Sequence, residues 1–152
     1  MTAPYKKNFK LPKGYTMEAY LSDILELADS YFDGFEVLQN YLFKERKFNL
    51  FEPASFLATH SAELYIKALI IHYTGSDLIS KSKGHNLIKL LKLLSKYDPK
   101  SSFLDEPIRA LEKYSGIKMR YVEYNQAGVL YGSDEISQVR VVKSYVKEKL
   151  SN

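Results

Sequence analysis

Apolar residues recur at intervals of three and four through one long stretch near the start of this chain. This pattern predicts a helix that buries one face. Thr16 precedes the stretch in the position of an N-cap. Gly34 lies inside it and costs roughly 1 kcal/mol relative to alanine. Because the spacing continues past Gly34, we expect one long helix from Met17, either straight or bent at the glycine. The apolar positions are Leu21, Ile24, Ala28, Tyr31, Phe35, Leu38 and Leu42.

Further helices are predicted along the rest of the chain. The second should begin at Pro53, whose missing N–H costs nothing in a first turn, and stop at Gly75. Residues 117–132 are expected to form an extended loop, because a lone short strand would have nothing to pair with. The longest loop should therefore lie between residues 115 and 133. The other helices are expected over about 86–97, from Pro107 with Asp105 as its cap, and from the cap Ser133 onward. The predicted fold is all-α, an up-and-down antiparallel bundle of four to five helices without a sheet.

Length and composition set further bounds. The 152 residues predict a flexible basic arm over 1–15 and a single helical domain over 16–152. There is no cysteine and no His-x-x-x-His, so we expect no metal and no cofactor. No stretch is apolar enough for a signal peptide or a membrane span, and we expect a cytoplasmic protein that avoids membranes. The net charge of +4 is mildly basic, short of a dedicated nucleic-acid binder.

Glu63 and Lys67 are one helical turn apart in the segment Ala62-Glu63-Leu64-Tyr65-Ile66-Lys67-Ala68-Leu69. Two interpretations are open. The pair is either an exposed i, i+4 ion pair worth about 0.2–0.5 kcal/mol, or a shielded pair that orients a neighbour across the bundle. The apolar neighbours on both sides favour shielding.

Four residues could bind an anion. Lys81, Lys83 and His85 come just before the third predicted helix, where free backbone N–H groups also attract anions. Arg120 stands among tyrosines in the sequence. Its guanidinium could stack on an aromatic ring, or form bidentate hydrogen bonds with a phosphate or carboxylate. The alternatives are a capping role for His85 or Asn86, and a structural pair between Arg120 and a carboxylate. A stripe of lysines on the third helix is either part of this site or a solvated face; it comprises Lys89, Lys92 and Lys96.

Acidic residues of the first helix lie opposite its apolar positions. We expect them to face water, because carboxylates used in acid–base chemistry require burial and mutual perturbation. They are Glu26, Asp29, Asp33 and Glu36.

The first helix also has aromatic residues outside its apolar positions, and this surface is more than one core easily covers. We therefore predict a homodimer with two-fold symmetry. These aromatic residues are Tyr20, Phe32, Tyr41 and Phe43.

The order of these features resembles the HEPN family (higher eukaryote and prokaryote nucleotide-binding). The resemblance covers about residues 17–150. It rests on the long first helix, the 62–69 segment, the opening Gly84-His85-Asn86-Leu87, and Arg120-Tyr121 before the last helix. It implies a helical bundle of a kind that often dimerises. Some members are metal-independent ribonucleases, while others are non-catalytic partners of nucleotidyltransferases or bind nucleotides and substrates.

The ribonuclease branch of the family has an arginine followed by a histidine after four to six residues, near the last helix. Here the histidines are His60, His72 and His85, and no arginine has a histidine at that spacing. Residues 121–126 offer no replacement for imidazole as a proton carrier near neutral pH. This departure points away from catalysis.

We therefore expect a non-catalytic HEPN-type binding module that recognises a nucleotide, an RNA phosphate or a nucleotidyltransferase partner. The expected ligand-binding residues are Lys81, Lys83, His85 and Arg120, with Glu63 and Lys67 as the supporting pair. Two alternatives remain: a metal-independent ribonuclease with an unorthodox active site, and a helical interaction scaffold without a small ligand.

Overall fold

The regular structure of the chain is helical throughout the residues that the computed structural model describes, which are 11–76, 86–115 and 126–152. No strand occurs in these residues. The predicted all-α class is therefore confirmed. The elements in chain order are α1 (Met17–Lys44), the 3-10 turn η2 (Phe48–Leu50), α2 (Phe51–Thr74), α3 (Leu87–Ser95), the 3-10 segment η3 (Pro99–Leu104), α4 (Asp105–Glu112), α5 (Gln126–Ile136) and α6 (Val139–Ser151).

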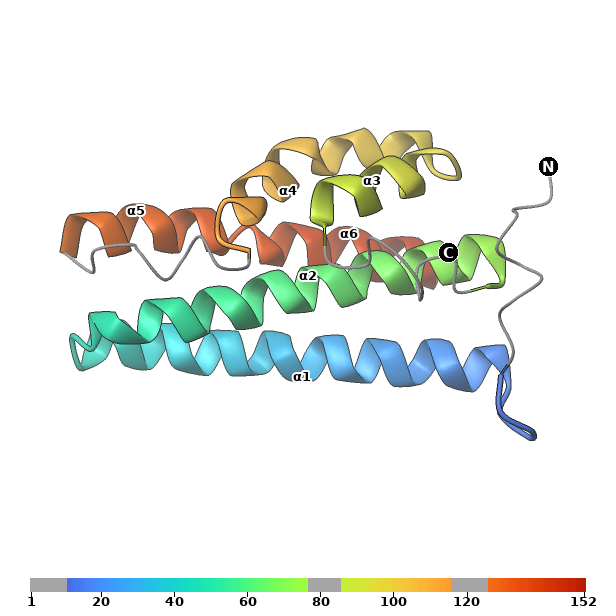
Figure 1. Cartoon of the computed structure of the whole chain (residues 1–152), viewed down its shortest axis with the longest axis horizontal. Helices are drawn as coiled ribbons and strands as arrows, with labels where there is room; N and C mark the ends of the chain where they lie inside the picture. The colour runs from blue at the N-terminus through green and yellow to red at the C-terminus, as the bar shows by residue number, and fades with distance from the viewer. Residues whose placement is uncertain (1–10, 77–85, 116–125) are drawn as a thin grey trace.

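The two longest helices, α1 and α2, lie side by side in opposite directions along the long axis of the molecule (Figure 1). α5 and α6 follow one another along a third rod, and α6 packs against α2. The shorter helices α3 and α4 run in opposite directions and pack on each other and on α2. This is the predicted antiparallel up-and-down arrangement.

α1 begins where its cap predicts, because Thr16 Oγ1 accepts a hydrogen bond from the Ala19 N–H at 3.0 Å. The helix continues unbroken through Gly34. Its buried face is broader than the predicted one, since α1 is covered by α2 on one side and by residues of α6 on another. The buried residues are Ala28, Phe32, Phe35, Gln39 and Leu42.

α2 begins at Phe51, so Pro53 falls in its first turn rather than at its first position. Gly75 ends the helix as predicted: it has a φ of +65°, and its N–H donates to the Ile71 carbonyl at 2.7 Å. The residues between are buried on nearly all sides, because α1, α3, α5 and α6 each contact α2. α2 is therefore the central helix of the bundle.

Two predictions about the last third of the chain are wrong. Residues 126–132, predicted as loop, belong to α5, and Ser133 lies inside α5 instead of capping the last helix, which begins at Val139. Tertiary packing decides this. Gly132 lets α5 approach Phe51, and a Cβ at this position would lie 2.4 Å from the Phe51 Cζ. The remainder of the predicted loop, 116–125, lies outside the described residues.

A smaller difference concerns α4, which starts at Asp105 directly after η3, so Asp105 is its first residue rather than its cap. The third helix agrees with its prediction, since Leu87, Leu90, Leu91 and Leu94 are buried.

One hydrophobic core joins all of these helices. Its largest fully buried side chains include Tyr65, Phe35, Phe51 and Leu42. In the described part of the chain, no helix has the combined length and apolarity that crossing a lipid bilayer requires.

Candidate functional site

The Glu63–Lys67 pair forms on α2, and it is shielded rather than exposed. Lys67 Nζ donates to Glu63 Oε1 at 2.7 Å, and Glu63 is only 5% exposed. The spacing of one helical turn brings the two groups together. The surrounding residues of α2 are buried, so little water reaches the carboxylate. Of the two expectations for this pair, exposure is wrong and shielding is what the structure shows.

His60 joins this pair, which makes a cluster of three residues that we call the His60–Glu63–Lys67 cluster. Its Nδ1 lies 3.6 Å from Glu63 Oε2. The imidazole ring also contacts the edge of Tyr31 at a centroid distance of 4.5 Å and stacks on Phe56 at 5.6 Å. The prediction did not include His60 in the site. Its position three residues before Glu63 on the same helix is the sequence signal that could have revealed it.

Desolvation offsets most of the stability that the Glu63–Lys67 ion pair could contribute. Removing two charges from water costs several kcal/mol per ion, and their attraction only roughly offsets this. An apolar pair of similar volume would serve the core about as well. What the structure shows is that Glu63 contacts both neighbours on the central helix, Lys67 Nζ at 2.7 Å and His60 Nδ1 at 3.6 Å.

A second polar network crosses three helices. The hydroxyl of the fully buried Tyr65 donates to Asp29 Oδ1, and Lys147 Nζ donates to Asp29 Oδ2 at 2.8 Å. Burial would raise the pKa of the Asp29 carboxyl, but the bonds from Lys147 and Tyr65 outweigh it, so the pKa is lowered overall. Burial, followed by the bond to Asp29, raises the pKa of Tyr65. The phenol therefore stays a donor, and this network joins α1, α2 and α6.

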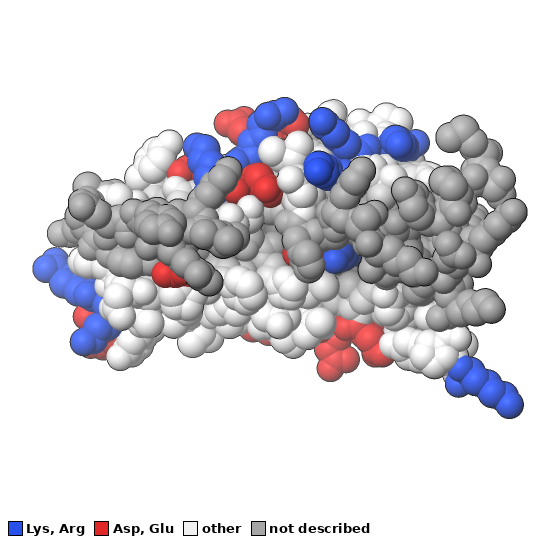
Figure 2. Space-filling model, in the orientation of Figure 1, with Lys and Arg blue, Asp and Glu red and all other residues white. Residues whose placement is uncertain are grey.

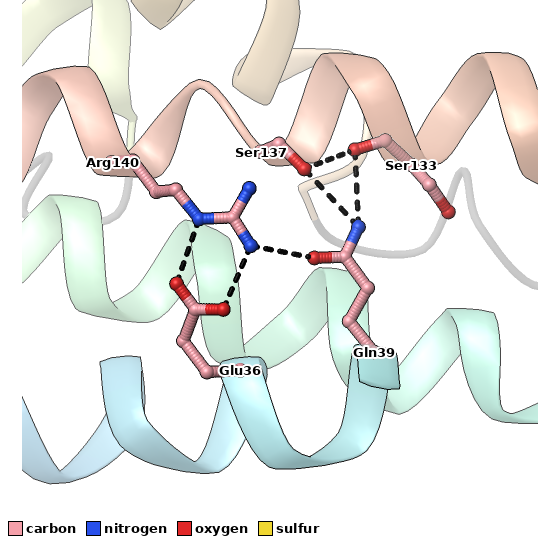
Figure 3. Close-up of polar contacts among 5 residues, drawn as sticks. All are labelled: Glu36, Gln39, Ser133, Ser137 and Arg140. Atoms are coloured by element: carbon pink, nitrogen blue, oxygen red, sulfur yellow. Dashed lines mark hydrogen bonds and ion pairs between the residues drawn. The ribbon is translucent and has the colours of Figure 1, made fainter. Parts of the chain in front are cut away.

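A third network joins α1 to the junction of α5 and α6 (Figure 3). Arg140 binds both carboxylate oxygens of Glu36 at 2.7 Å and donates to Gln39 Oε1 at 3.3 Å. Gln39 Nε2 in turn donates to the Ser133 carbonyl and to Ser137 Oγ, at 3.3 and 3.1 Å. The network fixes the turn between the two last helices against α1.

These two networks correct one prediction. Asp29 and Glu36, expected to face water, are both paired with cations of α6. The reason is that α6, which packs on α2, extends Arg140 and Lys147 to these two carboxylates of α1. The sequence of α1 alone does not reveal this third helix. Glu26 and Asp33 are exposed as expected.

The N-terminus of α3 is already occupied by groups of the chain itself. Asn86 Oδ1 accepts a hydrogen bond from the Lys89 N–H at 3.0 Å, which confirms the capping role considered for Asn86. Glu112 Oε2 accepts from the Leu87 N–H at 3.1 Å. A carboxylate therefore stands where an anion would otherwise approach these N–H groups. Lys89, Lys92 and Lys96 are exposed on the outer face of α3.

The four residues predicted to bind the ligand lie outside the described residues. Lys81, Lys83 and His85 belong to residues 77–85, and Arg120 belongs to residues 116–125. Of the predicted site, the structure brings together Glu63 and Lys67, and it adds His60.

A groove that the sequence did not predict runs between α4 and the α5–α6 rod. Its volume is about 770 Å³, and the exposed rings of Phe103 and Tyr131 are among its lining residues. Both of its cations are bound to carboxylates, because Lys113 binds Glu135 at 2.5 Å and Arg109 binds Asp105 at 3.0 Å. The groove therefore offers an anion no cation that is not already paired.

In the described ranges, histidine and carboxylate side chains do not gather in groups of three that could hold a metal ion.

Comparison with known protein families gave a match. The model of the HEPN domain family matches residues 40–149, from the last turn of α1 to the end of α6. No curated protein and no solved structure matched the chain. The family match spans well over half of the sequence and agrees with an all-α bundle built around α2. The chain therefore belongs to the HEPN domain family.

Proposed function

We propose that this chain is a non-catalytic HEPN-type binding module that recognises a nucleotide, an RNA phosphate or a nucleotidyltransferase partner. Lys81, Lys83, His85 and Arg120 are the proposed ligand contacts, and Glu63 with Lys67 is the supporting pair. The first two ligands share a phosphate group, which lysine and arginine bind through charge-assisted hydrogen bonds.

The observation that carries this proposal is the shielding of the His60–Glu63–Lys67 cluster. Glu63 is 5% exposed and holds Lys67 at 2.7 Å on the central helix. A buried carboxylate paired with a lysine is a costly feature for a core, because both charges lose hydration. Its presence supports a site in which α2 supplies an oriented positive group.

The N-terminus of α3 contributes less to phosphate binding than free N–H groups would. Asn86 and the Glu112 carboxylate already accept hydrogen bonds there. In our proposal the phosphate is therefore held by side chains, with Lys81 and Lys83 supplying the charge and Arg120 the paired donors.

The same residues argue against catalysis. Metal-independent cleavage of RNA requires a group that accepts and returns a proton near neutral pH, most often histidine. No arginine of this chain is followed by a histidine at the spacing of the ribonuclease branch. His60 is packed between Tyr31 and Phe56, which leaves its ring committed to packing.

A binding titration with thermal melts tests the proposal. The protein is titrated with a labelled single-stranded RNA and separately with ATP, using the wild type, Arg120→Ala and the double variant Lys81→Ala/Lys83→Ala. We expect each variant to weaken binding at least about tenfold, the effect of losing one good charged contact, while the melting temperature stays within a few degrees. The double variant Lys44→Ala/Lys47→Ala removes equal charge at the opposite end of α2 and is the matched control.

Three results would contradict parts of this proposal. Unchanged binding with a large drop in melting temperature would make Arg120 structural. Equally weakened binding in the control variant would mean that only the net charge of the protein matters for binding, and not the positions of Lys81 and Lys83. RNA cleavage in the presence of EDTA, abolished by His85→Ala, would favour the ribonuclease alternative. Co-purification with a nucleotidyltransferase, without affinity for RNA or ATP, would select the partner role.

We further propose that the module is a homodimer. Five large apolar side chains of α1 and α2 are exposed, and exposed apolar surface of this kind marks an interaction face. They are Leu27, Val37, Tyr41, Phe56 and Tyr73. Of the aromatic residues first considered for this face, Tyr41 is exposed, but Phe32 is buried in the core. Light scattering at tens of micromolar should give twice the 17.6 kDa of one chain.

A further inference from the structure

The groove between α4 and the α5–α6 rod has the size of a binding site, and its two sides are tied together. Its volume is about 770 Å³, within the range of ligand-binding clefts. One oxygen of the Glu135 carboxylate on α5 accepts a hydrogen bond from Lys113, at the end of α4, at 2.5 Å. The other oxygen accepts one from the Tyr114 hydroxyl. These bonds hold the two sides of the groove at a fixed separation.

Two aromatic rings are exposed on the walls of the groove. Phe103 of η3 is 64% exposed, and Tyr131 of α5 is 66% exposed. Tyr145 of α6 stacks on the Phe103 ring at a centroid distance of 6.1 Å and supports it from one side. Because so much of each ring is accessible, it can contact either an apolar side chain or a cation. The rings alone therefore do not decide what the groove binds.

The charges of the groove favour a cation. Lys113 and Arg109 are already bound to carboxylates. Glu106 and Asp134 also line the groove, both are exposed, and neither forms a salt bridge with a described residue. The unpaired charge of these lining residues is therefore negative, although the whole chain has a net charge of +4. A phosphate would be repelled here, whereas a cation would gain two partners.

The surface around α4 does not reverse this preference. Figure 2 shows acidic and basic side chains mixed along the upper edge of the molecule, where α3 and α4 lie. A nucleic acid is attracted by a continuous basic surface, which neutralises successive phosphates. This edge therefore suits a nucleic acid poorly, and a protein segment that carries its own positive charges fits better.

Arginine is the side chain that matches both the rings and the carboxylates. Its guanidinium stacks on aromatic faces and binds a carboxylate through two parallel hydrogen bonds. The groove offers two rings and two unpaired carboxylates, which is more than one guanidinium can use. A segment with more than one arginine fits this number of contacts. Apolar side chains between the arginines would meet the apolar part of the lining, which includes Ala110 and Val141.

We infer that this groove is a docking site for an arginine-containing, partly apolar segment of a partner protein. Glu106 and Asp134 bind the guanidinium groups, and Phe103 and Tyr131 stack on them. This inference goes beyond the proposed function, because it uses other residues than the proposed phosphate contacts. Failure of either one therefore leaves the other intact.

Calorimetric titration with a peptide tests the recognition of charge. The probe is a short capped peptide of alternating arginine and leucine, and its counterpart has glutamate in place of arginine. We expect wild type to bind only the arginine peptide. Glu106→Gln/Asp134→Asn should weaken this binding at least about tenfold, because both carboxylates lose their charge. Glu26→Gln/Asp33→Asn removes equal charge from exposed positions of α1 and is the matched control, with unchanged affinity expected.

A second variant tests the rings separately from the carboxylates. Phe103→Leu/Tyr131→Leu keeps apolar side chains and removes both π faces, so the arginine peptide should bind about tenfold more weakly. Because all four altered side chains of the groove are exposed, the melting temperatures of both groove variants should stay close to that of wild type.

The contrary outcomes have distinct meanings. Equal affinity in Glu106→Gln/Asp134→Asn and in the control, or equal binding of the two peptides, would overturn the recognition of arginine by these carboxylates. Weaker binding of single-stranded RNA by Phe103→Leu/Tyr131→Leu would assign the groove to RNA and overturn the protein partner. Tighter binding of the arginine peptide after deletion of the basic residues 1–10 would make the chain's own arm the occupant, in place of a partner protein.

Discussion

Arg140 on α6 holds both carboxylate oxygens of Glu36 on α1, one through Nε and the other through Nη2, at 2.7 Å each. This two-pronged contact links residues 104 positions apart in the sequence. It attaches the last helix to the first, next to the Gln39 bonds that fix the α5–α6 turn.

The Glu36–Arg140 pair should give the bundle a measurable acid sensitivity. The hydrogen bond from Arg140 lowers the pKa of Glu36 below its ordinary value. A lowered pKa stabilises the fold above the unfolded value, about 4.3 for glutamate, and this contribution is lost as pH falls through the folded value. Glu36→Gln should cost about 0.5–1 kcal/mol at pH 7, a small amount because both groups are partly exposed.

The measurement is a set of urea unfolding curves from pH 7 to pH 2. The difference between wild type and Glu36→Gln should shrink below about pH 4.3 and vanish in strong acid. Asp105→Asn breaks the exposed Arg109–Asp105 pair and is the control, with an expected effect of no more than a few tenths of a kcal/mol at pH 7. A difference that is constant with pH would contradict the ionic account.

Tyr65→Phe should destabilise the bundle by about 1.5 kcal/mol, a typical value for one hydrogen bond to a charged group. The ring would remain in the core, where Tyr65 is fully buried, while Asp29 would lose the hydroxyl donor and keep Lys147. Tyr31→Phe is the matched control, because no hydrogen bond of its hydroxyl is found among the described residues. Chemical denaturation at pH 7 gives the free energy of unfolding of both variants. Equal losses of stability would contradict a stabilising role for the Tyr65–Asp29 hydrogen bond.

Gly132→Ala should destabilise by about 1–3 kcal/mol, the usual cost of overpacking a core. The new Cβ would lie 2.4 Å from the Phe51 Cζ. The ring cannot easily move aside, since it is buried and makes a T-shaped contact with the Tyr114 ring at a centroid distance of 5.5 Å. The loss should shrink in a Phe51→Leu background, where the side chain is shorter. A double-mutant cycle by thermal melting would reveal the coupling, and additive losses would contradict it.

Sequence patterns predicted those helices whose ends are determined by residues nearby in the sequence. Thr16, Gly75 and Asn86 end or begin helices through local hydrogen bonds, and their roles agree with the predictions. α5 was missed because its residues pack on a distant part of the chain, as Gly132 does on Phe51, while Ser133 followed by two acids imitates a helix start.

The polar networks were harder to predict than the helices. Glu63 and Lys67 are one turn apart, so spacing alone could pair them. Asp29 and Glu36 find their cations on α6, more than a hundred residues away, and periodicity within α1 placed them on a solvent face. Long-range partners of this kind depend on which helices become neighbours, and a single sequence does not state that.

The shielded pair on α2 allows a last prediction that separates function from stability. Lys67→Met removes the donor at 2.7 Å and leaves the Glu63 carboxylate, 5% exposed, with one cation fewer. The expected loss is about 1–3 kcal/mol, the cost of a buried group that loses its partner. Glu63→Met/Lys67→Met replaces both charges with apolar groups, and the double variant should recover most of the loss or exceed wild-type stability.

The double variant then serves as a folded protein without the supporting pair. If Glu63 and Lys67 orient the ligand site, the double variant should bind single-stranded RNA or ATP at least about tenfold more weakly than wild type. This loss of affinity should appear although the melting temperature of the double variant is restored. The comparison is made by titration beside thermal melting on the same samples. Full affinity in the restored protein would assign the pair to the core alone and remove the observation on which the proposed binding function depends.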